Sequence, residues 1–347
     1  MIVMRSYTFF MKGFVDKKFN IDNIKEPPVD TSYKGRQELL FPDTTPIKQI
    51  FLESLRSTGK LQYKRYTGSP LRYAGGKSLA VGFVTELLPD SVNKIISPFL
   101  GGGSIEIALA NELGLQVIAY DVFDILCTYW QVQLSDPDGL ARKLQTFTPD
   151  RDTFSKVKKD LKEYWEDNRK MNNLELASHY YFNSNTSYGP HFLGWPSDIY
   201  LNPTRYGKMV QKVKHFNVPN LSVECMPFEE SMPLHKDDFF YCDPPYYLEE
   251  GKMFTGMYPH RNFPIHHKGF KHELLRDYLL NHNGGFILSY NDCPIIRDWY
   301  SDCNIETPEW QYTFGQGDTR IGENRKQNGG SHIKKSHELL IWRHPYD

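Results

Sequence analysis

The stretch NKIISPFLGGGSIEIALANELGLQVIAYD, residues 93–121, decides the fold class of this chain. A short apolar run at 93–97 predicts a strand, and the glycines at 101–103 predict a tight turn after it. The apolar run at 105–113 predicts a helix, and residues 116–120 predict a second strand. This succession opens a doubly wound α/β sheet. We therefore expect a Rossmann-like fold, with a ligand lying against the backbone of the glycine turn.

The sheet pattern extends on both sides of this stretch. Residues 78–88 have the spacing of a helix that precedes the first strand. An apolar strand at 238–242, a helix at 271–281 and a strand at 285–290 continue the alternation. Residues 338–342 predict the last strand, so the sheet spans most of the chain.

The middle of the chain interrupts this alternation. It contains a charged helical stretch at 154–168 and an aromatic segment at 180–206 whose Asn, Ser, Gly and Pro residues predict loops. We expect an inserted, mainly helical and loop-rich domain. The predicted division is a catalytic domain of residues 66–122 and 216–347, an insert of residues 123–215, and an N-terminal extension of residues 1–65 without an assigned role.

Composition sets limits on the class of protein. The chain has 347 residues, 39% of them hydrophobic, which suffices for a large core, and its formal charge of -1 confines any nucleic-acid surface to a local basic patch. Five cysteines without a C-x-x-C pair argue against a disulfide framework and against a zinc site. The sequence has no apolar stretch of about 18 residues and no signal peptide, so we expect a cytoplasmic protein of bacterial or viral origin without a membrane segment.

The tetrapeptide Asp243-Pro244-Pro245-Tyr246 follows the apolar strand at 238–242. Its aspartate therefore lies at the carboxyl end of a parallel strand, where open α/β sheets bind ligands. A carboxylate and a backbone carbonyl that accept both hydrogens of an amino group aim its lone pair at an electrophile, and Tyr246 is free to stack on a base. A rigid Pro-Pro loop without a chemical role is the alternative.

A second acidic residue, Asp121, ends the strand that follows the glycine turn. The turn departs from the G-x-G-x-x-G fingerprint, so a dinucleotide is not indicated. An acidic side chain about 20 residues after such a turn typically binds ribose hydroxyls. A tight turn followed by a capping aspartate is the alternative.

The segment Leu71–Ser78 ends in Gly-Lys-Ser like a phosphate loop, but Leu71 occupies the place of the first glycine. The segment therefore does not match a Walker loop. The Gly-Gly-Lys turn instead brings the ammonium of Lys77 toward a bound carboxylate, or is an ordinary turn before a helix.

Two basic stretches suit phosphate contact or form a solvated face. Residues 202–215 contain Arg205, Lys208, Lys212 and Lys214 and no acid, and residues 320–335 surround the Asn-Gly-Gly segment 328–330. A third segment, residues 249–268, has aromatic and histidine residues that suit closure over a base. Its histidines lack further ligands at metal spacing, so no metal is expected.

The four motifs in this order, with an insert before the last, resemble the Dam-type, alpha-group (D12 class) DNA adenine-N6 methyltransferases. The resemblance covers about residues 70–342. It implies S-adenosylmethionine as methyl donor, S-adenosylhomocysteine as product, and no metal. The catalytic residues that it implies are Asp243, Pro244, Pro245 and Tyr246. The cofactor-binding residues that it implies are Tyr73, Lys77, Pro98, Phe99, Gly101, Gly103, Ser104, Asp121 and Asp243.

The resemblance also implies double-stranded DNA as partner, with an adenine extruded from the duplex. The DNA-binding residues that it implies are Tyr188, Arg205, Tyr206, Lys208, Asn328 and Lys334. Residues 190–204 diverge from the best-known members, which leaves the target sequence open. A solitary enzyme and one accompanied by a separate restriction endonuclease both remain open, as does the oligomeric state. An RNA adenine methyltransferase and a DNA-binding protein without methylation activity are the alternatives.

Overall fold

The sheet at the centre of the fold is seen in a computed structural model that describes residues 45–58, 62–247, 269–308 and 338–345. All described residues belong to one unit, residues 43–347. The strand order is β3-β2-β1-β4-β5-β7-β6, with five parallel strands and β7 antiparallel to both its neighbours. The strands are β1 (Lys94–Ser97), β2 (Gln116–Asp121), β3 (Leu221–Cys225), β4 (Phe239–Cys242), β5 (Phe286–Asn291), β6 (Asn304–Glu306) and β7 (Glu338–Arg343).

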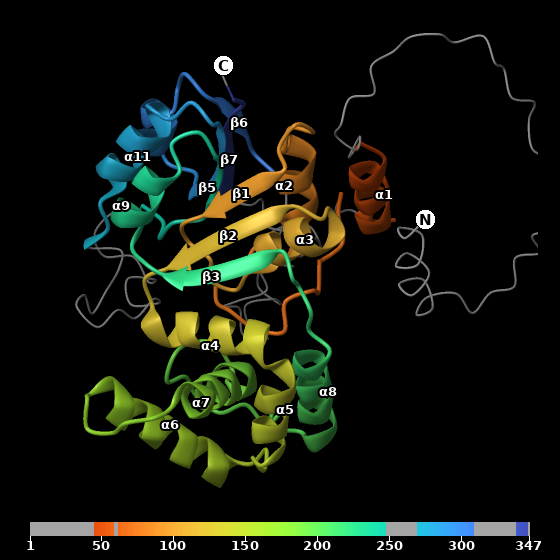
Figure 1. The fold of residues 1–347 in the computed structure, drawn as a ribbon, viewed down its shortest axis with the longest axis vertical. Coiled ribbons are helices and arrows are strands. Elements are labelled where there is room, and N and C mark those ends of the chain that lie inside the picture. Colours follow the sequence, from red (N-terminus) through yellow and green to blue (C-terminus); the bar gives the residue numbers. More distant parts are fainter. Residues whose placement is uncertain (1–44, 59–61, 248–268, 309–337, 346–347) are drawn as a thin grey trace, which may run out of the picture. The chain divides into compact units, whose positions relative to one another are not determined.

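Helices cover both faces of this sheet, as a buried parallel sheet requires. Because side chains alternate along a strand, Ile95 joins the core under one face and Ile96 the core under the other. Figure 1 shows α2 and α3 on one side and α9 and α11 on the other. The elements outside the insert are α1 (Thr45–Leu55), α2 (Val81–Leu87), α3 (Ser104–Glu112), α9 (Phe228–Ser231), the 3₁₀ helix η1 (Met232–Leu234), α11 (His272–Leu280) and α12 (Pro294–Trp299).

The insert between β2 and β3 is helical. It consists of α4 (Asp124–Ser135), α5 (Pro137–Gln145), α6 (Arg151–Trp165), α7 (Asn173–Thr186) and α8 (Pro203–Lys214). The last four begin where the sequence supplies a cap: the side chains of Asp136, Asp150, Asn172 and Asn202 each accept a hydrogen bond from the backbone N–H three residues later. In Figure 1, α5 to α8 gather beyond α4, away from the sheet. No helix in the described parts of the chain is long and apolar enough to cross a membrane.

The predicted elements are mostly confirmed, with one correction in the insert. Residues 180–206 were expected to be loops, but helix α7 extends to Thr186. Every residue of α7 from Leu176 to Thr186 is buried, so the helix has no polar face and no 3.6-residue periodicity to reveal it. Strand β3 was also not predicted from the sequence, because only two of its five residues, Leu221 and Val223, are buried.

A short segment before α2 ties the insert to the sheet. The backbone N–H of Arg72 donates to the side-chain oxygen of Asn185 (2.7 Å), and the Asn185 amide donates to the carbonyl of Pro70 (3.1 Å). The Arg72 guanidinium donates to the carbonyls of Asn185 and Ser187, at 2.9 and 2.8 Å. Lys212 of α8 donates to the carbonyl of Ser69 (2.6 Å). The insert is therefore held against the chain that leads into Lys77.

Candidate cofactor and catalytic site

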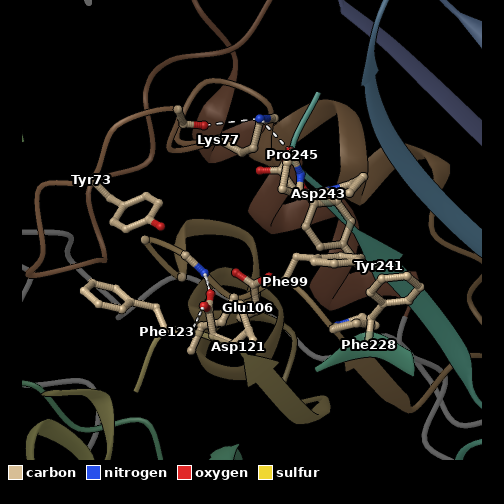
Figure 2. A pocket seen from close by; sticks show the side chains of 18 of the residues that line it. Tyr73, Lys77, Phe99, Glu106, Asp121, Phe123, Phe228, Tyr241, Asp243 and Pro245 are labelled. Carbon is tan, nitrogen blue, oxygen red and sulfur yellow. Dashed lines mark hydrogen bonds and ion pairs between the residues drawn. The ribbon is translucent and has the colours of Figure 1, made fainter. Parts of the chain in front are cut away.

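A cavity of about 510 Å³ opens at the carboxyl ends of β1, β2 and β4. The chain runs outward from β1 to β2 and β3, and then from β4 to β5 on the other side, so β1 and β4 flank the point where the strand order reverses. Open α/β sheets bind ligands at this switch point, and a cavity of this size suits a drug-sized molecule. Figure 2 shows Tyr73 and Tyr241 on opposite sides of the cavity.

The glycine turn forms one wall of the cavity. Gly101 and Gly103 have φ values of 49° and 65°, which favour glycine. A Cβ at Gly101 would lie 2.9 Å from the Tyr73 ring, and one at Gly103 would lie 3.0 Å from the Trp130 ring. The Trp130 indole N–H also donates to the Gly101 carbonyl at 3.0 Å. The turn therefore carries no side chain toward the ligand space and is held from behind by α4.

Asp121 fixes the other end of this turn. Its two carboxylate oxygens accept hydrogen bonds from the backbone N–H groups of Gly101 and Phe123, each at 3.0 Å. Burial raises the pKa of Asp121, whereas these two hydrogen bonds lower it. Each oxygen keeps a second lone pair that can accept a hydroxyl of a ligand.

Lys77 and Asp243 meet at the edge of the cavity. The Lys77 ammonium lies 2.7 Å from the Asp243 carboxylate and donates to the carbonyl of Gly75 at 3.2 Å. The lysine was expected to face a bound carboxylate, and in this structure it faces the aspartate at the end of β4. Burial raises the pKa of Asp243 to about 6, although the lysine ammonium lowers it. The carboxylate is therefore ionised at neutral pH.

Tyr246 lies beside the cavity and is not among the residues that line it. Its ring is stacked near the ring of Tyr290, with centroids 6.2 Å apart and planes at 29°. The Lys77 ammonium lies 5.0 Å from the centre of the Tyr246 ring. The half-buried ring is held in one orientation next to Asp243.

The nine residues expected to bind the cofactor all line this cavity, as do Pro244 and Pro245. Sequence reasoning missed Glu106, Phe123, Phe228, Tyr241 and Phe270. Glu106 carried a signal, because it is a charged residue between apolar ones in the first turn of the helix after the glycine turn. Phe228 had none, since the strand that precedes it was not predicted.

The residues expected to contact DNA divide into three groups: exposed, buried and outside the described residues. Tyr188 is 68% exposed, and Arg205 and Lys208 are exposed on α8. Tyr206 is only 4% exposed, and its hydroxyl donates to the carbonyl of Leu144 at 2.8 Å. We therefore withdraw Tyr206 from the proposed DNA-binding residues, because its ring packs within the helices. Asn328, Lys334 and the segments 249–268 and 320–335 lie outside the described residues.

The cavity fits S-adenosylmethionine. The rings of Phe99, Phe228 and Phe270 lie 5.1 to 5.7 Å apart and provide apolar surface for an adenine. Asp121 suits ribose hydroxyls, and the carboxyl of Asp243 suits a positive charge of the methionine part. Within the described residues, no group of three or more His, Cys, Asp or Glu side chains is placed to hold a metal ion. The sheet and the lining of this cavity fit the class of Rossmann-like, S-adenosylmethionine-dependent methyltransferases.

Comparison with known proteins gives the family. The family model of the D12 class N6 adenine-specific DNA methyltransferases matches residues 73–314, and the chain belongs to this family. Methylation of adenine N6 in DNA is the reaction that defines the family, and membership implies S-adenosylmethionine as methyl donor.

Three relatives are type II methyltransferases by name. The chain is 25% identical to M.FokI of Planomicrobium okeanokoites, over 77% of this chain and 43% of that protein. It is 26% identical to M1.LlaDCHI of Lactococcus lactis subsp. cremoris, over 78% of this chain and 96% of that protein. It is 26% identical to M.MjaIII of Methanocaldococcus jannaschii, over 51% of this chain and 68% of that protein. The chain thus spans less than half of M.FokI and nearly all of M1.LlaDCHI.

Proposed function

We propose that the chain is a site-specific methyltransferase that extrudes an adenine from duplex DNA and methylates its N6. The observation that carries this proposal is the carboxylate of Asp243, which lies at the end of β4, at the edge of the cavity, and 2.7 Å from the Lys77 ammonium. Bound S-adenosylmethionine supplies a methyl group that is already activated by its sulfonium, so the protein mainly has to position the acceptor.

Asp243 and the carbonyl of Pro244 accept the two hydrogens of the adenine amino group. This pairing localises the nitrogen lone pair, which is otherwise delocalised into the ring, and directs it toward the cavity. Lys77 holds the Asp243 side chain in place, and its positive charge keeps the carboxylate ionised. Tyr246 stacks on the extruded base and offsets part of the cost of unstacking, which is a few kcal/mol.

The helices of residues 123–215 form the target-recognition insert in this proposal. Exposed Arg205 and Lys208 contact phosphates, and Tyr188 contacts the duplex on a turn closed by the bridge between Ser187 and Pro196. We place the enzyme in the cytoplasm of a bacterium or of a virus-infected cell, where its DNA substrate is found. The relatives are named type II methyltransferases, and in this proposal a separate restriction endonuclease accompanies the enzyme.

The test is incubation of the purified chain with unmethylated DNA of mixed sequence and labelled S-adenosylmethionine. Nucleoside analysis identifies the product, and single-molecule sequencing locates it. The proposal expects N6-methyladenine at one short motif. Label in RNA and none in DNA would move the substrate to RNA, and cofactor binding without label in either would leave a binding protein.

A further inference from the structure

Glu106 is a buried acid on the wall of the cavity to which no role has been assigned. It lies in the first turn of α3 and is 2% exposed. Its carboxyl oxygen Oε1 accepts a hydrogen bond from the Ser97 hydroxyl, at 2.6 Å. Figure 2 shows its carboxyl between Asp121 and Tyr241. A carboxyl in this position faces the ligand space, where it is costly to leave charged and unpaired.

Acidic side chains outnumber basic ones among the residues that line the cavity. Among the lining residues, Lys77 pairs with Asp243 at 2.7 Å, and Lys271 pairs with Glu229 at 3.3 Å. Within the described residues, Glu106 makes no ion pair with Lys, Arg or His, and its hydrogen-bond donor Ser97 is neutral. A cation supplied by the ligand would complete its environment.

We infer that Glu106 binds the α-ammonium group of S-adenosylmethionine. This inference rests on the proposed function. The cofactor carries two cations, a sulfonium and an α-ammonium. A sulfonium has no hydrogen-bond donor, whereas an ammonium has three, and a carboxylate inside a protein requires both opposite charge and donors. Glu106 also lies on the side of β1 and the glycine turn, while the sulfonium must face the amine held at Asp243.

Protonation of Glu106 agrees with this role. The pKa of Glu106 is raised to about 8, mainly by burial and in smaller part by the nearby carboxylates of Asp243 and Asp121, although the Ser97 hydroxyl lowers it. The free protein therefore holds a proton on Glu106 at pH 7. A bound ammonium favours the ionised form, so cofactor binding releases this proton. Lys77 and Tyr241 also line the cavity, and Tyr241 holds its own proton in this pH range because burial raises its pKa far above 10.

The first measurement is calorimetric binding of three ligands to the wild type and to Glu106→Gln. The ligands are S-adenosylmethionine, S-adenosylhomocysteine, which keeps the ammonium but lacks the sulfonium, and an S-adenosylhomocysteine analogue with hydrogen in place of the amino group. Glu106→Gln keeps the size of the side chain and the Ser97 hydrogen bond. We expect its Kd to rise about 10- to 100-fold for the first two ligands, the range of a charged hydrogen bond, and to stay unchanged for the third. Glu224→Gln, which removes an exposed acid from β3, is the matched control.

The second measurement counts protons. Binding at pH 7 in buffers of different ionisation enthalpy should release close to one proton from the wild type and from Glu224→Gln, and none from Glu106→Gln. Circular dichroism establishes that each variant is folded. If Glu106→Gln does not fold, the amino-free analogue still tests the idea on the wild type, which should bind it about 10- to 100-fold more weakly than S-adenosylhomocysteine.

The outcomes separate the inference from the function on which it rests. A weaker Kd for S-adenosylmethionine alone would assign Glu106 to the sulfonium and overturn the inference. Equal affinities of wild type and Glu106→Gln for all three ligands would make Glu106 a structural acid, with the methyltransferase proposal intact. If the wild type binds none of the ligands, the methyltransferase proposal itself fails.

Discussion

The cavity and the helical insert use charge in opposite ways. In the cavity, Lys77 is 6% exposed, and its ammonium lies 2.7 Å from the carboxylate of Asp243. The proposed chemistry therefore depends on one buried pair of charges. In the insert, Arg205 and Lys208 are exposed, and the aromatic side chains of Tyr188 and Trp195 are 68% and 78% exposed. Interactions in water are weaker and more easily replaced than those in a dry site. Substitutions in the cavity should therefore have large, specific effects, and those on the insert surface smaller, additive ones.

The largest effect is expected at the catalytic carboxylate. Asp243→Ala removes the acceptor that orients the target amine, and turnover should fall at least about 100-fold, the usual loss for one such group. DNA affinity, measured by fluorescence anisotropy, should stay within about threefold, because phosphate contacts supply most of the affinity for DNA. Full turnover in labelled-methyl assays would refute the mechanism.

The junction between the two regions gives the next largest effect. Asn185→Ala removes a side chain that is 0% exposed and leaves the Arg72 N–H without its acceptor at 2.7 Å. The free energy of unfolding, from urea titration, should fall by about 2 kcal/mol. Replacing the exposed Asn217 by Ala is the control and should change it by less than about 0.5 kcal/mol. Equal effects for the two variants would mean that the junction does not stabilise the fold.

The pH dependence of turnover tests the charge of the cavity. The pKa of Asp243 is raised to about 6, so its carboxylate is ionised above that pH and protonated below it. With S-adenosylmethionine saturating, kcat/KM for DNA should fall about tenfold for each pH unit below 6. Circular dichroism at pH 5 controls for unfolding. A flat profile between pH 5 and pH 7 would mean that the ionised carboxylate is not required.

The smallest effect is expected on the insert surface. Arg205→Ala removes one phosphate contact, so Kd for DNA should rise about three- to tenfold, and the slope of log Kd against log salt should fall by about one. Lys236→Ala is the control. It removes one exposed charge just before β4, at the amino end of that strand, whereas the cavity lies at the carboxyl ends of the strands. If both variants bind DNA equally, the recognition surface lies elsewhere.

The sequence alone determined the elements whose signal is local. An apolar run, a glycine turn and a second run predict β1, α3 and β2, because torsion preferences and side-chain periodicity act over a few residues. The same holds for Asp121 and Asp243. A residue that ends or follows a parallel strand lies at the carboxyl end of the sheet, where ligands bind, whichever strand that is. The expected cofactor-binding residues that follow β1, together with Asp121 and Asp243, line one cavity for this reason.

Only the tertiary structure decided which distant groups meet. It paired Lys77 with Asp243, buried Tyr206 among the insert helices and placed Glu106 on the cavity wall. Lys212 belongs to the basic stretch that was expected to contact phosphates. In the structure its ammonium donates a hydrogen bond to the carbonyl of Ser69. These outcomes depend on strand order and helix packing, which place residues far apart in the chain within a few ångströms. A buried helix such as α7 shows the same limit, because a segment surrounded by protein on all sides has no polar face for its sequence to record.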